Sequence, residues 1–346
     1  MEFNKDKYYD KGLTGLANVG NSCYINSCMQ LLSHTYELNE LLTNLDKNKI
    51  NDNIDATVLI EWNNLREMIW NENCTIAPWG FIKTIQSVAK KKGIELFMGY
   101  SQNDVTEFLL FIIECLHTSL KRDVDMSIKG NAINNLDLLA KDCYTMMENM
   151  YKNEYSELLN IFYGISITQI KSFETDEVLS RKCEPFSILT LSLPENNKTT
   201  SIFECLDNYS KNEELKDDNA WFNEKTNEKE DVNKNIIFWN LPNVLIIELK
   251  RFDNSNKKIR SLVNTELEDV DFSKYVSGYN ANEYIYDLFG VANHMGNVFG
   301  GHYTANIKNL NGKWYNFNDT NISIITKNKV ITEFTYCLFY RKKNKN

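Results

Sequence analysis

Cys23 has the residue type and the position for nucleophilic chemistry. It follows Asn21 and Ser22, which are good helix N-caps, and it precedes a run of apolar residues at helical spacing, so the pattern predicts that it opens a helix. At a helix N-terminus the backbone N–H groups and the macrodipole favour negative charge, which predicts a lowered thiol pKa and a populated thiolate. Asn18 lies on the preceding loop, where its side-chain amide could donate to an oxyanion that forms beside the sulfur.

His302 offers the base that a cysteine nucleophile needs. It follows a Gly-Gly pair, which lets the backbone approach a ligand closely, and it opens a predicted strand. A turn at 309–312 returns the chain antiparallel, and counting back from this turn places Asn318 or Asp319 across from His302, within a register step. An imidazole beside a carboxamide or a carboxylate forms the base and orienter of a nucleophilic triad. The sequence leaves open which of the two side chains orients the ring.

Two carboxylates stand at the start of a second predicted helix. Ser101 is a suitable N-cap, Asp104 follows it at capping-box spacing, and the run behind them is strongly apolar. Glu107 lies one turn further on the face of Asp104. Asp104 therefore has a structural interpretation as a capping residue. The pair also has a functional one, because two carboxylates at the exposed end of a buried helix form a site for a cationic peptide.

The elements that must position these residues divide the chain into a helical first part and a mainly β remainder. Helical patterns precede residue 161, and after it β-branched and aromatic residues between turn signals predict strands. The stretch 213–235 is highly charged and predicts a solvated loop. The predicted helices cover 38–45, 56–69, 78–88, 101–117, 121–160 and 201–209, and the predicted strands cover 162–170, 178–182, 186–193, 243–253, 284–293, 302–308 and 313–319.

Composition narrows the class of protein. Of the 346 residues, 42% are hydrophobic and 25% are charged, which is ordinary for a globular protein with a large core. The net charge of −9 argues against a nucleic-acid partner. No apolar run has the length of a membrane span, so we expect no membrane partner. The eight cysteines include no CxxC pair, which argues against a disulfide framework or a local zinc site and favours a reducing compartment, cytoplasmic or nuclear.

Several stretches of the chain resemble the motifs of the ubiquitin-specific proteases, a papain-like family of deubiquitinating cysteine proteases. The order Cys, His, Asn is also that of papain-like enzymes. The resemblance implies that Cys23 is the nucleophile, His302 the base and Asn18 an oxyanion donor. Asn318 matches the third triad position, and Asp319 matches the neighbouring position that assists polarisation or the oxyanion. The resemblance is densest in residues 13–32, 101–117, 184–194, 241–253 and 290–319.

The same resemblance implies a substrate and the residues that contact it. Asp104 and Glu107 match the acidic positions that receive the arginine-bearing tail of ubiquitin. Arg251 and Phe252 end the buried strand and match an Arg-Phe pair that faces the substrate channel. Two further residues match positions that line this channel, namely His294 and Tyr303. We therefore expect ubiquitin and ubiquitin-conjugated proteins as partners of a monomeric enzyme that needs no cofactor.

The resemblance also implies an α+β, papain-like architecture. One catalytic domain would span residues 1–346, with a helical thumb over about 1–160, an extended β finger over about 161–240, and a β palm over about 241–346 with returning strands. Many members bind zinc in the finger through two CxxC pairs. The corresponding positions here hold no cysteine, so we expect a finger without metal. These positions are Phe173, Asp176, Asn223 and Thr226.

The implied reaction is hydrolysis of the isopeptide or peptide bond after the C-terminal glycine of ubiquitin, through a Cys23 thioester. One alternative is a catalytically silent ubiquitin-binding module, against which the intact Cys23, His302 and Asn318 argue. The other is a protease for a different ubiquitin-like modifier. The sequence leaves the second alternative open, because a similar Arg-Gly-Gly tail would dock on the same carboxylates.

Overall fold

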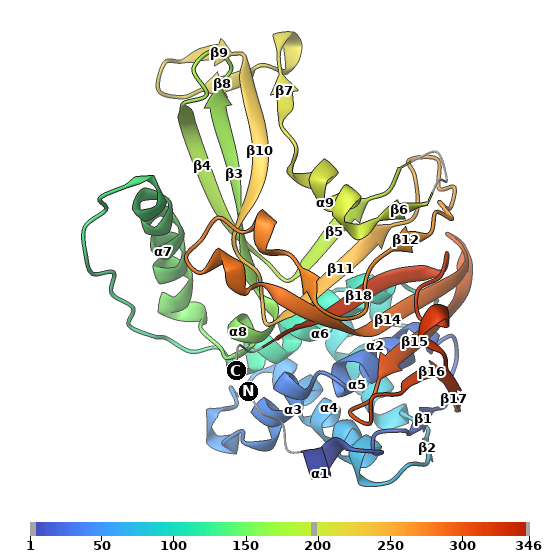
Figure 1. Cartoon of the computed structure of the whole chain (residues 1–346). Coiled ribbons are helices and arrows are strands. Elements are labelled where there is room, and N and C mark those ends of the chain that lie inside the picture. The colour runs from blue at the N-terminus through green and yellow to red at the C-terminus, as the bar shows by residue number, and fades with distance from the viewer. Residues whose placement is uncertain (1–4, 195–198, 344–346) are drawn as a thin grey trace.

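Helices build the first part of the chain, and a mainly antiparallel sheet builds the last part (Figure 1). The computed structural model describes residues 5–194 and 199–343. This mixture confirms the predicted α+β class. The helices are α1 (Lys5–Tyr8), α2 (Cys23–Ser33), α3 (Tyr36–Thr43), α4 (Ile54–Asn71), α5 (Trp79–Lys92), α6 (Val105–Leu120), α7 (Asn135–Glu154), α8 (Leu158–Phe162) and α9 (Ile202–Ser210).

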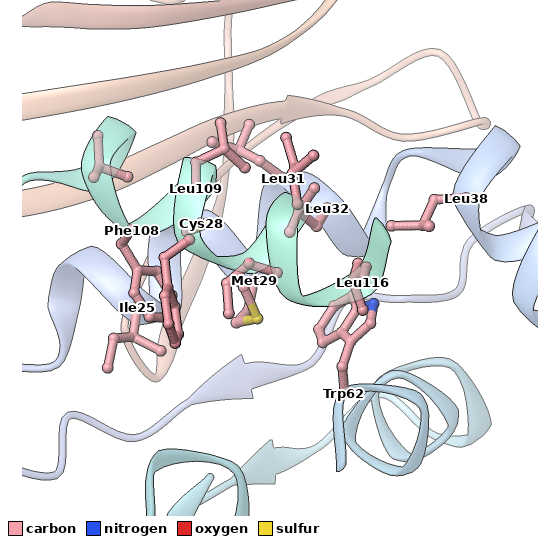
Figure 2. Packing of buried hydrophobic residues seen from close by; sticks show 14 of the residues in the cluster. Ile25, Cys28, Met29, Leu31, Leu32, Leu38, Trp62, Phe108, Leu109 and Leu116 are labelled. Atoms are coloured by element: carbon pink, nitrogen blue, oxygen red, sulfur yellow. The ribbon is translucent and has the colours of Figure 1, made fainter. Parts of the chain in front are cut away.

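Helix α2 is the centre of the helical part. All of its residues are buried, and it packs on α6 on one side and on strands of the large sheet on another. Figure 2 shows Met29 and Leu32 of α2 among side chains from α6 and α4, including Leu116 and Trp62. A helix buried along its whole length is held rigidly by its neighbours. Its first residue, Cys23, therefore has a fixed position.

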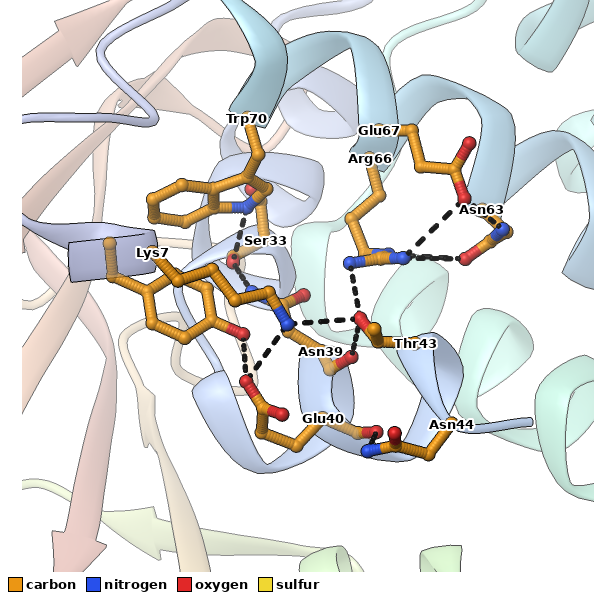
Figure 3. A network of polar contacts seen from close by, with 11 residues as sticks. Lys7, Ser33, Asn39, Glu40, Thr43, Asn44, Asn63, Arg66, Glu67 and Trp70 are labelled. Atoms are coloured by element: carbon orange, nitrogen blue, oxygen red, sulfur yellow. Dashed lines mark hydrogen bonds and ion pairs between the residues drawn. The ribbon is translucent and has the colours of Figure 1, made fainter. Parts of the chain in front are cut away.

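A polar network ties the outer helices together (Figure 3). Lys7 donates to Glu40 at 3.0 Å and so joins α1 to α3. Arg66 of α4 is almost fully buried and donates to Asn63 at 2.9 Å and to Thr43 at 3.4 Å. A buried guanidinium is stable only with such partners. The network therefore holds α1, α3 and α4 in place around α2.

The large sheet carries the C-terminal part of the chain. Its strand order is β17-β16-β15-β14-β18-β11-β5, and β13 pairs with β14 outside this path. All of its pairings are antiparallel except that of β11 with β5. The strands are β5 (Ile188–Ser192), β11 (Val244–Lys250), β13 (Val270–Asp271), β14 (Ile285–Asn297), β15 (Gly300–Lys308), β16 (Trp314–Asn318), β17 (Asn321–Ile325) and β18 (Thr335–Lys342).

A second sheet extends away from the large one (Figure 1). It has the order β4-β3-β10-β7 and carries a two-stranded ribbon, β8-β9. Its strands are β3 (Gly164–Ser172), β4 (Val178–Phe186), β7 (Glu213–Leu215), β8 (Trp221–Asn223), β9 (Glu228–Glu230) and β10 (Val232–Asn240). Two short parallel pairs complete the structure, β1 (Gly15–Leu16) with β2 (Thr75–Ile76) and β6 (Thr200–Ser201) with β12 (Val263–Asn264).

The predicted loop over 213–235 is wrong, because three short strands and the start of β10 lie in it. These strands are mostly exposed, so their charged side chains stay in water while the backbones pair. Lys234 of β10 forms an ion pair across the sheet with Glu213 of β7 at 3.2 Å. Strand pairing that buries little surface leaves no apolar alternation in the sequence.

Ordinary contacts occupy the four positions at which the sequence analysis expected no metal ligands. Asn223 and Thr226 both donate to Glu230 at 2.8 Å. The Lys216 ammonium lies 3.7 Å from the centre of the Phe173 ring, and Asp176 pairs with Lys171 at 3.3 Å. Across residues 5–194 and 199–343 no group of histidine, cysteine and acidic side chains is arranged to hold a metal ion. In the same ranges no helix has the length and apolar character to cross a bilayer.

Candidate active site

Cys23 is the first residue of α2, as predicted, and only 2% of it is exposed. The predicted lowering of its pKa is wrong for this conformation. Burial raises the pKa of the thiol and the charge of Asp319 adds to this, although backbone hydrogen bonds from Tyr303 and Tyr24 act in the opposite direction. Desolvation disfavours the thiolate more than the helix N-terminus favours it. The thiol therefore needs a base to become a nucleophile.

The structure resolves which side chain orients His302. The ring Nε2 lies 2.7 Å from Oδ1 of Asn318. Because this oxygen accepts, Nε2 carries the hydrogen, and Nδ1 keeps a lone pair that can take a proton. The register Ala305↔Phe317 between β15 and β16 places Asn318 diagonally across from His302, within reach of a side chain. The hydrogen bond from the Tyr303 backbone to Cys23 brings the same part of β15 to the sulfur.

Asp319 has a different partner. One of its oxygens accepts from the Asn18 amide at 3.0 Å, and the other accepts from the Asn26 amide at 2.8 Å. The Asn18 oxygen in turn accepts from the backbone N–H of Ser22 at 3.1 Å. Asn18 is therefore held at both ends of its amide group, directly before the helix that Cys23 opens. Asp319 thus orients the predicted oxyanion donor, whereas Asn318 orients the imidazole.

Asp104 caps α6 and also anchors two tyrosines. One oxygen accepts from the backbone N–H groups of Thr106 and Glu107, at 2.7 and 3.2 Å. The other accepts from the hydroxyls of Tyr336 and Tyr303, at 2.6 and 3.3 Å. The helix begins at Val105, so the predicted N-cap at Ser101 is wrong and Asp104 is the cap itself. The Thr106 hydroxyl also contacts the capping oxygen, so Asp104 has five donors within reach and is mainly a positioning group.

Glu107 is exposed, and a third carboxylate that the sequence analysis missed lies near it. Glu248 of β11 accepts from the Thr190 hydroxyl at 2.7 Å, and the Thr106 hydroxyl, which has one hydrogen, lies between Glu248 at 2.8 Å and Asp104 at 2.5 Å. Burial, then Asp104, then Glu248 raise the pKa of Glu107. Among the described residues, no ion pair with a lysine or arginine involves any of the three carboxylates. We call Asp104, Glu107 and Glu248 the acidic cluster.

Arg251 is not where the sequence analysis expected it. The residue is fully buried, and its guanidinium donates to the backbone carbonyls of Thr335, Ile259 and Ser261. It therefore cannot contact a substrate in this structure. Its role is to satisfy three carbonyl groups beneath the large sheet. The neighbouring Phe252 is half-buried, and its ring centre lies 6.0 Å from that of His294.

Replacing Arg251 with alanine is expected to lower the free energy of unfolding by about 3 kcal/mol, because three buried carbonyl groups lose their donor. The Michaelis constant should stay unchanged at temperatures where the variant is folded. Urea unfolding and steady-state kinetics measure the two quantities, and Lys250→Ala on the exposed neighbouring position is the matched control. A higher Michaelis constant with an unchanged unfolding midpoint would restore the substrate-contact prediction.

His294 and Tyr303 lie together behind the acidic cluster. Their rings stack with centres 4.6 Å apart, and both residues are buried. Lys258 donates to the backbone carbonyl of His294 at 2.6 Å. Burial, and then the charge of Lys258, lower the pKa of His294 to about 4, so the imidazole is neutral. These side chains support Asp104 and the strand that carries His302.

Gln102 is a second functional candidate that the sequence analysis missed. Its side-chain amide donates to the carbonyl of Gly301 at 2.8 Å and accepts from the N–H of Gly301 at 2.6 Å. A Cβ atom at Gly301 would lie 2.4 Å from the His294 ring, so this position requires glycine. Gln102 thus fixes the backbone directly before His302 from the opposite side of the site.

Replacing Gln102 with alanine is expected to lower kcat/KM about tenfold, because the backbone that precedes His302 loses both of its side-chain hydrogen bonds. Gln86→Ala is the matched control, since the Gln86 amide also donates to a backbone carbonyl, that of Gly99, but lies away from His302. Steady-state kinetics of both variants decide the matter. Equal activity of the two would mean that Gln102 does not position the base.

Comparison with known proteins gives a consistent result. The chain matches the family described as ubiquitin carboxyl-terminal hydrolase over residues 14–340. Human ubiquitin carboxyl-terminal hydrolase 2 is 32% identical in an alignment of 345 positions that covers 95% of this chain and 55% of that protein. Drosophila melanogaster ubiquitin carboxyl-terminal hydrolase Usp2 is 29% identical in an alignment of 339 positions that covers 96% of this chain and 35% of that protein. The chain therefore spans about half the length, or less, of these two relatives.

Solved structures match over the whole chain. The SAGA deubiquitinating module of Ubp8, Sgf11, Sus1 and Sgf73, solved with monoubiquitin, matches with a TM-score of 0.73 and 25% identity, over 97% of this chain and 70% of that chain. The same module with ubiquitin aldehyde matches with a TM-score of 0.74 and 24% identity, over 100% of this chain and 72% of that chain. These likenesses confirm the predicted papain-like fold.

Proposed function

The chain belongs to the ubiquitin carboxyl-terminal hydrolase family, and on this premise we propose that it hydrolyses the bond after the C-terminal glycine of ubiquitin through a thioester on Cys23. The observation that carries the proposal is the His302–Asn318 pair at 2.7 Å on the strand that meets the Cys23 sulfur. A buried thiol, a base and an orienter of the base are the parts that this chemistry requires.

The reaction begins when Nδ1 of His302 accepts the Cys23 proton and the sulfur attacks the carbonyl carbon. The developing oxyanion accepts from the backbone N–H of Cys23 and from Asn18, whose amide has a second hydrogen besides the one it donates to Asp319. The carbon–nitrogen bond then breaks, and His302 returns its proton to the departing amine. Water, deprotonated by His302, hydrolyses the thioester and releases the carboxylate and the thiol.

The acidic cluster supports ubiquitin as the substrate. Glu107 and Glu248 carry negative charge that no basic side chain of the described residues neutralises through an ion pair. Such a surface favours a cationic peptide segment, and an arginine-bearing tail has that charge. Two of the structural neighbours were solved with ubiquitin or ubiquitin aldehyde. In this proposal residues 1–346 form one catalytic domain, with the extended sheet as the finger that contacts the body of ubiquitin.

The cellular setting is part of the same proposal. All eight cysteines are free, which suits a reducing compartment, cytoplasmic or nuclear. The proposed active species is a monomer, because every residue assigned to the reaction lies on this chain.

The test uses ubiquitin with a C-terminal thiol-reactive electrophile. The wild-type protein is expected to gain the mass of one ubiquitin, and Cys23→Ala is expected to gain none. Glu107→Gln should slow the adduct about tenfold through the loss of one charged contact, whereas Glu114→Gln, an exposed position further along the same helix, should not. Binding without adduct formation would indicate a silent ubiquitin-binding module. Absence of both would indicate another ubiquitin-like modifier.

A further inference from the structure

Two cysteines outside the active site lie in contact. Cys143 of α7 and Cys183 of β4 have their sulfur atoms 3.6 Å apart. Cys143 is fully buried and Cys183 is half-buried. No other pair of cysteines among the described residues has its sulfur atoms in such contact. Neither residue belongs to the chemistry proposed for Cys23.

We propose that Cys143 and Cys183 form a reversible disulfide when the protein is exposed to hydrogen peroxide, and that this bond links α7 to the second sheet, β4-β3-β10-β7, which we call the finger sheet. A disulfide has its sulfur atoms about 2.05 Å apart, so the two must approach by about 1.5 Å. Rotation about the Cα–Cβ bonds provides a shift of this size. Helix α7 already packs on β4, so the two backbones need no large displacement.

Cys183 is the sulfur that reacts first. It is the more exposed of the two, and the hydrogen bond from the Cys143 thiol lowers its pKa, which favours the nucleophilic thiolate. The Cys183 sulfur attacks one peroxide oxygen, the O–O bond breaks, and a sulfenic acid and water form. The Cys143 sulfur then attacks the Cys183 sulfur. The S–S bond forms, the S–O bond breaks, and the leaving hydroxide takes the Cys143 proton to give a second water.

The place of this pair in the fold gives the disulfide a mechanical effect. Helix α7 rests on the finger sheet through a small cluster that is separate from the two larger cores, and Cys143 lies inside it. The segment before the helix, 123–134, contains no helix or strand. Few apolar contacts therefore hold α7, and local opening of the helix is expected to be easy. A covalent link at Cys143 removes much of that freedom.

The test oxidises the full reduced chain with one equivalent of hydrogen peroxide and maps its tryptic peptides without reductant. The wild-type protein is expected to yield peptides 142–152 and 183–198 joined, with the loss of two hydrogens, and dithiothreitol should separate them. Amide hydrogen exchange in α7 should slow at least about tenfold in the oxidised form. Cys74→Ser, which removes an exposed cysteine elsewhere, should change neither result.

A variant that lacks the second sulfur tests the order of events. In Cys143→Ser, peroxide is expected to leave a sulfenic acid on Cys183 that dimedone traps, while no joined peptide forms. The wild-type map decides the proposal even if this variant folds poorly. Oxidation of Cys74 while peptides 142–152 and 183–198 stay separate would overturn it, as would a disulfide from Cys183 to any other cysteine.

Discussion

Replacing His302 with alanine is expected to lower kcat/KM for a ubiquitin substrate by about 10³-fold at neutral pH. The reason lies in the environment of Cys23. Burial raises the pKa of this thiol, so a thiolate is scarce without a base, and Asn318 holds the ring with the free Nδ1 available to accept the proton. Steady-state cleavage of a fluorogenic ubiquitin conjugate measures the loss. Added imidazole should partly restore activity to His302→Gly, since the space left by the ring can admit it.

The activity of His302→Ala should also depend on pH differently from that of the wild-type protein. A thiol with a raised pKa is protonated over the neutral range, and its thiolate fraction increases about tenfold for each pH unit below the pKa. The residual activity of His302→Ala should therefore keep rising from pH 7 to pH 9. The wild-type rate should depend less steeply on pH, because His302 accepts the Cys23 proton. A flat profile for His302→Ala over this range would mean that Cys23 is already ionised and that the predicted lowering of its pKa was correct for the active form.

The parts of the site that the sequence predicts are those set by local pattern. The N-cap residues and apolar spacing around Cys23 place the start of α2 correctly, because both signals lie within a few residues of the cysteine. The turn that follows β15 brings Asn318 to His302 for the same reason. Such signals act through neighbouring residues, and the remainder of the chain does not override them here.

The parts that the sequence did not predict depend on contacts between distant segments. Gln102 meets Gly301, and Thr106 meets Glu248, across separations of 199 and 142 residues. The sequence did contain one indication of the role of Glu248, because it is a single carboxylate within an otherwise apolar strand. The predicted substrate contact of Arg251 has a different reason for failing, because the sequence at the end of a strand does not show whether a side chain points into the core or toward solvent. The pKa of Cys23 depends on burial by the sheet, which the local helix pattern does not contain.

The assignment of Asp319 to the oxyanion donor leads to the second large expected effect. Asp319→Ala is expected to lower kcat by about 10²-fold, and Asn18→Ala by about 10²- to 10³-fold. Both variants misplace or remove the same donor, because the Asp319 carboxylate holds the Asn18 amide. The double variant should therefore lose little more than Asn18→Ala alone, whereas independent effects would multiply.

Asn318→Ala gives the matched comparison for this cycle. Asn318 neighbours Asp319 in the chain but contacts the His302 ring. The loss of kcat in the double variant Asn18→Ala/Asn318→Ala should therefore be close to the product of the two single losses. Values of kcat at saturating substrate, measured below the unfolding temperature of each variant, give the coupling free energy between each pair of substitutions. Asp319 would act on the imidazole if the losses of kcat from Asp319→Ala and Asn18→Ala multiplied while those from Asp319→Ala and His302→Ala did not. Strong coupling to Asn18 alone would mean that two adjacent residues of one strand end divide the catalytic work, one for the base and one for the oxyanion.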